Sequence, residues 1–224
     1  MTALNSRVSV YHSVEAVAGK VSSGSDLLEF TGIVKTYPRG QEVFGQGEQA
    51  DYVYKVVRGA VRCFKTLSDG RRQICDFALP GDVFGLELGG DYGVSAEAVA
   101  DCAIVAARRS TVLENSADPV AAAKAMVRLA MADLERSRDH ILTLGRRGAA
   151  ERVVVFLLEL NDRLDGGDTV ELPMSRQDMA DYLGLTIETV SRTLTHLEAE
   201  GLIALKCCRS IKLCDPRGLR RLCD

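Results

Sequence analysis

Residues 175–202 read SRQDMADYLGLTIETVSRTLTHLEAEGL, and this stretch decides how the rest of the chain is interpreted. Apolar residues recur three and four positions apart on both sides of Gly184, which is typical of two short amphipathic helices. A glycine between two such helices allows the left-handed backbone of a tight turn. Ser175, followed three positions later by Asp178, is a start signal for the first helix. We therefore predict a helix-turn-helix.

The second predicted helix carries a polar cluster on one face. Spacings of three and four place Glu188, Ser191 and Arg192 together, with Ile187 beside them. Arg192 can donate two parallel hydrogen bonds to guanine, Glu188 can accept from a cytosine amine, and Ser191 can contact a thymine edge. These side chains predict a helix that enters the major groove of DNA. The alternative is a surface ion pair between Glu188 and Arg192, which would need no DNA.

Composition sets limits on this interpretation. The 224 residues allow one large domain or two modest ones, and 46% hydrophobic with 26% charged residues is ordinary for a soluble protein. The net charge of -3 does not by itself favour binding to nucleic acid, so DNA binding must depend on where the basic side chains lie. Basic residues do gather around the predicted motif: Arg146, Arg147, Arg176, Arg192, Lys206, Arg209 and Lys212.

Targeting signals are not evident in the sequence. No apolar run is long enough to cross a bilayer, and the N-terminus lacks the basic and apolar regions of a signal peptide. We expect a cytoplasmic protein without membrane contact. Its seven cysteines are then expected to be reduced thiols.

The N-terminal half predicts a β domain. Residues 1–24 are small and polar without periodicity, and we interpret them as a flexible arm. Residues 25–110 contain short alternating segments separated by turn signals, such as Ser68-Asp69-Gly70 and Pro80-Gly81-Asp82. This spacing favours a compact antiparallel β-barrel or jelly roll.

Residues 111–145 predict a long helix after a short one. Asp118 before Pro119 is a helix start signal, and small or apolar residues then recur in a heptad pattern. The predicted seam consists of Val120, Ala123, Val127, Ala130, Leu134, Ser137, Ile141 and Leu144. Three of the four d positions of the heptads hold small residues (Ala123, Ala130 and Ser137). Small side chains allow a partner helix to pack closely, so we predict a parallel homodimer. The alternative is that this stripe packs on its own domain.

Residues 146–224 predict the DNA-binding domain. A basic hinge is followed by an amphipathic helix over 149–163, a short strand at 169–173 and the two-helix motif. Two further short strands after Gly201 predict a wing. The fold class is therefore α+β, with a barrel, a dimerisation helix and a winged helix-turn-helix.

This order of motifs resembles the Crp/Fnr superfamily of bacterial transcription regulators. The most specific segments are GQEVFGQGEQADYVYKVVRGAVR at 40–62, LSDGRRQICDFALPGDVFG at 67–85 and the motif at 175–203. The resemblance implies a cupin-like jelly roll of the cyclic-nucleotide-binding type. It also implies a homodimeric regulator, mainly an activator and not an enzyme, that binds palindromic double-stranded DNA and recruits RNA polymerase.

The motif itself resembles the Fnr and FixK branch, which carries Glu, two spacers and Ser-Arg, as in Glu188 to Arg192. Ile187 stands where the cyclic-AMP receptor branch usually has arginine. The branch implies TTGAT-like half-sites in an inverted repeat and a role in the response to oxygen limitation and in nitrogen fixation. The same resemblance assigns phosphate contacts to Arg176, Thr186 and Thr189, and a contact with RNA polymerase to Arg71 and Arg72.

The ligands that the superfamily suggests do not match the residues. No cysteine precedes Cys63, so the N-terminal cluster ligands of the iron-sulfur members are missing. Segments 85–87 and 94–95 lack the arginine that faces a cyclic-nucleotide phosphate. No histidine lies between His12 and His140, which disfavours haem and a metal oxygenase. We expect no cofactor and no metal, and we keep two alternatives: an unidentified small effector in the barrel, or control by thiol oxidation.

Overall fold

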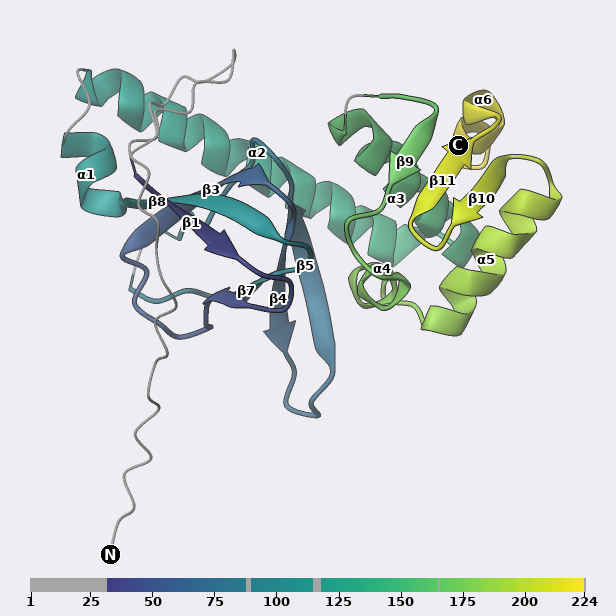
Figure 1. The fold of residues 1–224 in the computed structure, drawn as a ribbon, viewed down its shortest axis with the longest axis horizontal. Coiled ribbons are helices and arrows are strands. Elements are labelled where there is room, and N and C mark those ends of the chain that lie inside the picture. The colour runs from purple at the N-terminus through teal and green to yellow at the C-terminus, as the bar shows by residue number, and fades with distance from the viewer. Residues whose placement is uncertain (1–31, 88–89, 115–117, 165, 224) are drawn as a thin grey trace, which may run out of the picture.

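The computed structural model describes residues 32–87, 90–114, 118–164 and 166–223. The predicted N-terminal arm, 1–24, lies outside these residues. A β domain and a mixed C-terminal domain lie on either side of one long helix, α2, which runs along the β domain toward the C-terminal domain (Figure 1). The α+β architecture predicted from the sequence is confirmed.

Two antiparallel four-stranded sheets form the barrel. One has the order β1-β8-β3-β6 and the other β2-β7-β4-β5. The strands are β1 (Ile33–Tyr37), β2 (Glu42–Phe44), β3 (Tyr52–Arg58), β4 (Val61–Thr66), β5 (Arg72–Ala78), β6 (Val83–Phe84), β7 (Ser95–Ala98) and β8 (Cys102–Arg108). Between β3 and β4, Gly59 has φ +87°, and a Cβ there would lie 2.6 Å from the Asp101 carbonyl oxygen. A side chain at this turn is therefore excluded by the neighbouring backbone.

Aromatic side chains fill the barrel interior. The rings of Phe44 and Tyr92 stack with centroids 3.8 Å apart, and Tyr54 and Phe84 stack at 5.3 Å. All four side chains are buried. Their burial contributes on the order of 2 kcal/mol each and fixes the two sheets against one another.

Helices α1 (Arg109–Glu114) and α2 (Pro119–Arg146) follow the last strand. The predicted start of α2 is confirmed, because the Asp118 carboxylate accepts hydrogen bonds from the amides of Val120 and Ala121. Ala122 and Ala125 are buried, and Ala125 packs with Val53 and Val105 of the barrel. One face of α2 is thereby fixed to its own barrel.

The C-terminal domain contains four helices and a three-stranded antiparallel sheet of order β10-β11-β9. Its elements are α3 (Ala149–Arg163), β9 (Thr169–Glu171), α4 (Arg176–Leu183), α5 (Ile187–Ala199), β10 (Ile203–Cys207), β11 (Ser210–Leu213) and α6 (Pro216–Arg221). Helix α6 was not predicted. Its start signal, Asp215 before Pro216, is the same as that of α2, and the Asp215 side chain caps the helix.

The barrel and the C-terminal domain share one apolar core. Ile74, Phe77 and Leu79 of the barrel side pack in the same cluster as Met179 and Leu194 of the helix-turn-helix. In the described part of the chain, no helix is long and apolar enough to cross a membrane.

Candidate nucleic-acid interface

Helices α4 and α5 form the predicted helix-turn-helix. The Ser175 side chain accepts a hydrogen bond from the Asp178 amide, and the Asp178 carboxylate accepts one from the Ser175 amide, so α4 begins with a capping box. Helix α4 ends at Gly184, whose φ of 62° is left-handed. Thr186 then caps α5 by accepting from the Thr189 amide. Local sequence signals thus set both helix starts and the turn.

Helix α5 has a buried face and an exposed face. Val190, Leu194 and Leu197 are buried in the domain core. Glu188 and Arg192 are exposed, Ile187 is also exposed, and Ser191 is half-buried. The predicted base-contacting residues therefore share the face that is open to solvent.

Glu188 and Arg192 do not form an ion pair within 4.0 Å. Among the described residues, the Arg192 side chain makes no hydrogen bond and no ion pair. The pKa of Glu188 is lowered, first by hydrogen bonds from its own amide and from Thr186, and then by the charge of Arg192. The carboxylate is thus ionised at neutral pH and can accept a hydrogen bond, while the guanidinium is available to an external acceptor.

The predicted phosphate-contacting residues lie around this exposed face. Arg176 Nη1 of α4 is 3.5 Å from Ser191 Oγ of α5, and the hydroxyls of Thr186 and Thr189 are 3.1 Å apart. Thr186 is exposed and Thr189 is half-buried at the start of α5. A helix N-terminus with hydroxyl groups and an arginine beside it suits a phosphate.

Strands β10 and β11 form the predicted wing. They pair antiparallel, and the Leu205 amide donates to Glu198 Oε1 at 2.8 Å, which ties the wing to the end of α5. Lys206, Cys207 and Cys208 are exposed at its tip. The wing therefore projects a cation and two thiols near the C-terminal end of α5.

The outer face of α2 is apolar and exposed. Val120, Val127, Leu134 and Ile141 of the predicted seam are between 42% and 66% exposed. The smaller seam residues Ala123 and Ser137 are exposed, whereas Ala130 and Leu144 are half-buried. Ala122 and Ala125, which are buried, lie on the side of α2 that faces the barrel, and Ala130 and Ser137 of the seam line a cavity with barrel residues. The four large seam residues stay largely exposed, and the dimer seam stays a prediction.

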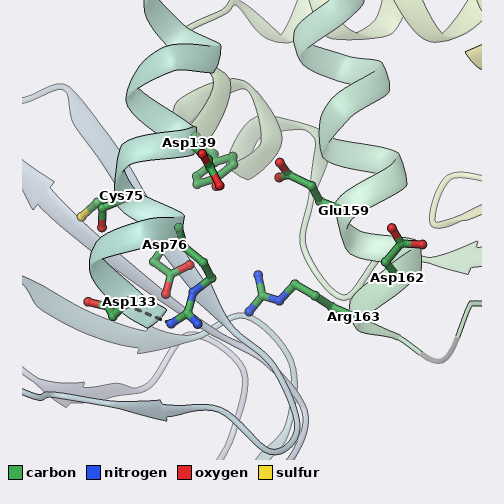
Figure 2. A pocket seen from close by; sticks show the side chains of 10 residues that line it. Cys75, Asp76, Asp133, Asp139, Glu159, Asp162 and Arg163 are labelled. Carbon is green, nitrogen blue, oxygen red and sulfur yellow. Dashed lines mark hydrogen bonds and ion pairs between the residues drawn. The ribbon is translucent and has the colours of Figure 1, made fainter. Parts of the chain in front are cut away.

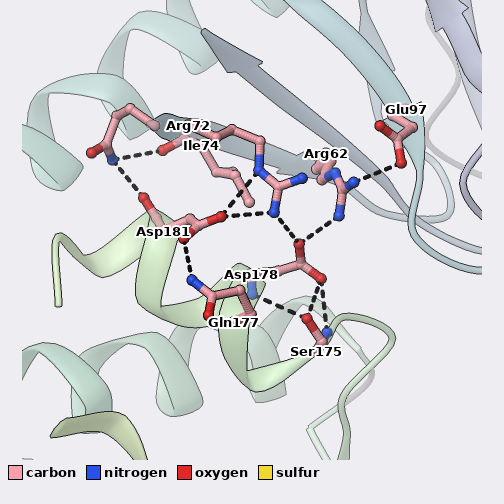
Figure 3. Close-up of polar contacts among 9 residues, drawn as sticks. Arg62, Arg72, Ile74, Glu97, Ser175, Gln177, Asp178 and Asp181 are labelled. Carbon is pink, nitrogen blue, oxygen red and sulfur yellow. Dashed lines mark hydrogen bonds and ion pairs between the residues drawn. The ribbon is translucent and has the colours of Figure 1, made fainter. Parts of the chain in front are cut away.

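The two arginines assigned to RNA polymerase have different surroundings. The Arg71 side chain is 79% exposed, and its one ion pair with the described residues is to the neighbouring Asp69. Arg72 instead points to α4, where its Nη2 lies 3.0 Å from Asp178 Oδ1 and 2.7 Å from Asp181 Oδ2 (Figure 3). The polymerase contact stays a prediction for both residues, and only Arg71 presents a free surface for it.

Two residues where the barrel, α2 and the C-terminal domain meet were not predicted from the sequence. Arg62 of β4 binds both Glu97 and Asp178 (Figure 3). Arg152 of α3 donates to the carbonyls of Leu144 and Leu183, at 2.7 and 3.0 Å, and so joins α2 to α4. These partners are far apart in sequence, so local periodicity does not reveal them.

A cavity of about 360 Å³ lies between the barrel and α2. Glu87, Asp76 and Asp133 line it, together with Phe84 and Val94, and none of the described residues that line it is a lysine or an arginine. Glu87 Oε2 is buried and has no hydrogen-bond partner in the described structure. This set of side chains is acidic and apolar, so it does not fit the phosphate of a cyclic nucleotide.

A second cavity, of about 310 Å³, lies where β5, α2 and α3 meet. Asp139 of α2 and Glu159 of α3 face one another across it (Figure 2). Burial raises the pKa of Glu159, and the charge of Asp139 adds to this effect. Beside the cavity, the His140 ring stacks on Tyr182 of α4 at 3.9 Å. In the described ranges, no group of three or more His, Cys, Asp or Glu side chains could hold a metal ion.

Comparison with known families agrees with this architecture. Residues 34–116 match the model of the cyclic nucleotide-binding domain, and residues 151–222 match that of the Crp-like helix-turn-helix domain. The solved structure of FixK2 from Bradyrhizobium japonicum superposes with a TM-score of 0.80 at 46% identity. That match covers 84% of this chain and 96% of the FixK2 chain.

Curated relatives point the same way. The nitrogen fixation regulation protein FixK of Rhizobium meliloti is 44% identical over 86% of this chain and 88% of its own length. FixK of Azorhizobium caulinodans is 48% identical over 85% of this chain and 79% of its own length. The transcriptional activator protein FnrL of Cereibacter sphaeroides is 32% identical over 84% of this chain and 79% of its own length. The chain therefore belongs to the Crp/Fnr family, and it is a transcriptional activator of the FixK/Fnr type.

Proposed function

We propose that the protein acts in the cytoplasm as a homodimer that binds an inverted repeat with TTGAT-like half-sites and recruits RNA polymerase. The observation that carries this proposal is the pair of exposed faces on one chain. The apolar face of α2 suits a second copy, and the polar face of α5 suits a base-pair edge. A twofold axis along α2 turns one recognition helix into two, which is the arrangement that a palindromic site requires.

The base contacts follow from the exposed face of α5. Arg192 donates to a guanine, Glu188 accepts from a cytosine amine, and Ser191 with Ile187 contacts a thymine. Arg176, Thr186 and Thr189 bind phosphates and fix the register of the helix, because phosphate contacts carry position rather than sequence.

We further propose that the activator needs no dissociable cofactor. Carboxylates line the cavity next to α2, and an anionic nucleotide would be repelled there. A second candidate function adds control by a small effector in this cavity. The observation in its favour is the buried Glu87 Oε2, which has no hydrogen-bond partner among the residues that the structure describes and suits a ligand that donates a hydrogen bond.

A gel-shift titration tests the main proposal. The protein is titrated onto a duplex with TTGAT and its inverted repeat, and onto a scrambled duplex of the same composition, at moderate salt. Specific binding typically exceeds non-specific binding by about a thousandfold or more. Equal affinity for the two duplexes contradicts the proposal.

A further inference from the structure

Helix α4 packs directly on the outer face of the barrel sheet that contains β4 and β5. It has eight residues. Isolated helices shorter than roughly 12 residues are marginal in water, so the surface on which α4 packs determines where it lies. Ile74 of β5 and Met179 of α4 are both fully buried in the shared core. Polar contacts at the two ends of α4 then fix its orientation on the sheet.

At the N-terminal end of α4, the carboxylate of Asp178 accepts hydrogen bonds from both domains. Asp178 Oδ2 accepts from the amide and the hydroxyl of Ser175, at 3.0 and 2.6 Å. Asp178 Oδ1 accepts from Arg62 Nη1 at 2.5 Å and from Arg72 Nη2 at 3.0 Å. The group that caps the helix is therefore also the group that binds the barrel (Figure 3).

Near the C-terminal end of α4, the barrel makes a second set of contacts. Asp181 Oδ2 accepts from Nε and Nη2 of Arg72, at 3.0 and 2.7 Å. Gln73 Nε2 donates to the carbonyls of Asp181 and Tyr182, at 2.8 and 3.3 Å. The last carbonyls of a helix have no partner within it, and here barrel side chains supply one. We call Arg62, Arg72 and Gln73, with Asp178 and Asp181, the interdomain clamp.

The clamp is shielded from solvent. Side-chain exposure is 15% for Arg62, 25% for Arg72 and 5% for Asp178. Burial alone would raise the pKa of the Asp178 carboxyl, but the Ser175 hydrogen bonds and the charges of Arg62 and Arg72 outweigh it and hold that pKa below its usual value. Charge-assisted hydrogen bonds in such a site are short and directional, so they fix orientation.

We propose that the interdomain clamp sets the orientation of the recognition helix relative to the barrel, so that Arg62 and Arg72 are positioning residues for DNA binding. Neither arginine needs to touch DNA. Since α2 would join the two barrels of the dimer, the clamp on each subunit fixes where each copy of α5 lies relative to the other. This inference rests on the proposed binding of an inverted repeat. Arg152 gives α4 another attachment, to α2, but not to the barrel.

The test compares two adjacent arginines on two duplexes. Arg72→Gln removes a clamp residue, and Arg71→Gln removes the same charge from the same hairpin without touching α4. Affinity is measured for a duplex with the TTGAT inverted repeat and for a duplex with one half-site. Arg72→Gln should lower affinity for the repeat by about tenfold or more, because it removes the hydrogen bonds that Arg72 donates to Asp178 and Asp181, and the loss of a single charge-assisted hydrogen bond already has about that effect. Affinity for the single half-site should stay within about threefold of wild type, because binding by one α5 does not depend on where the α5 of the other subunit lies.

A double-mutant cycle then tests whether the effect runs through Asp181. Arg72→Gln, Asp181→Asn and the double variant are compared on the inverted repeat, and the double variant should lose much less than the product of the two single losses. Circular dichroism spectra and melting temperatures of all variants are compared with those of the wild type, so that a loss of affinity caused by unfolding is recognised.

Three results overturn the inference: unchanged affinity of Arg72→Gln for the repeat, an equal loss on both duplexes, or an equal loss for Arg71→Gln. If the wild-type protein itself does not prefer the repeat to a scrambled duplex, the proposed function fails instead.

Discussion

Arg176 Nη1 of α4 lies 3.5 Å from Ser191 Oγ of α5, so a candidate phosphate contact and a candidate base contact are neighbours across the helix-turn-helix. The two helices begin at different caps, Ser175 and Thr186, and meet at these side chains. A phosphate bound by Arg176 would therefore fix the depth at which α5 lies in the groove.

Arg192→Ala should remove discrimination at the guanine of the half-site. The loss should be about 1–3 kcal/mol for the guanine-containing duplex and much smaller for a duplex changed at that base pair. Competition gel shifts with the four possible base pairs at that position measure it. Thr195→Ala, on an exposed neighbouring position of α5, is the matched control and should keep the wild-type preference. Undiminished discrimination in Arg192→Ala would show that the arginine has another role.

Arg176→Gln should weaken binding to every duplex by a similar factor. A phosphate contact releases counterions and carries no sequence information, so the slope of log K against log salt should fall by about one. Titrations at several salt concentrations, on specific and scrambled duplexes, measure this slope. A change in base preference with an unchanged slope would contradict a phosphate contact.

Leu134→Glu should convert the dimer to monomers. The side chain lies on the exposed apolar face of α2, and a charge buried against the same charge of a partner helix is strongly unfavourable. Sedimentation velocity measures the result. Ala132→Glu adds the same charge to an exposed position of α2 outside the seam and should leave the dimer intact. If Leu134→Glu has the same mass in solution as the wild type, the seam is elsewhere.

Much of the architecture follows from local signals. Asp118 before Pro119 predicts the start of α2, and the periodicity around Gly184 predicts α4, its turn and α5. The same kind of signal at Asp215 and Pro216 would have predicted α6. By contrast, the pair Arg62 and Asp178 joins residues 116 positions apart, and no local pattern encodes such a contact. Neighbouring residues of a hairpin face opposite sides, and the register that points Arg71 outward and Arg72 inward is set by tertiary packing.

Arg71→Ala should reduce transcription without changing DNA affinity. Its side chain is exposed at the tip of the β4–β5 hairpin, where a partner protein can reach it. In vitro transcription with purified RNA polymerase, run at saturating activator, measures the effect beside a gel shift of the same preparation. Equal transcript levels from the variant and the wild type would remove Arg71 from the polymerase contact.

A fall in pH should destabilise the contact between α2 and α4, in which His140 stacks on Tyr182. Burial lowers the pKa of this imidazole below its ordinary value of 6.5. The unfolded chain therefore binds the proton more readily, and the stability that the neutral ring contributes is complete above pH 6.5 and is lost as the pH falls toward the folded-state pKa. Urea unfolding at pH 7.5 and pH 5.5, at fixed protein concentration, should show a smaller difference for His140→Phe, which keeps the ring against Tyr182. An equal difference in both proteins would mean that His140 does not titrate on unfolding.

In the proposed complex, two recognition helices bind one DNA site from the same side of the duplex. Changing the spacing of the inverted repeat tests this arrangement, because half-sites one turn apart face the same side and half-sites about five base pairs closer or farther face opposite sides. We expect tight binding of a dimer at the first spacing and a large loss of affinity at the second. Equal affinity at both spacings would contradict it.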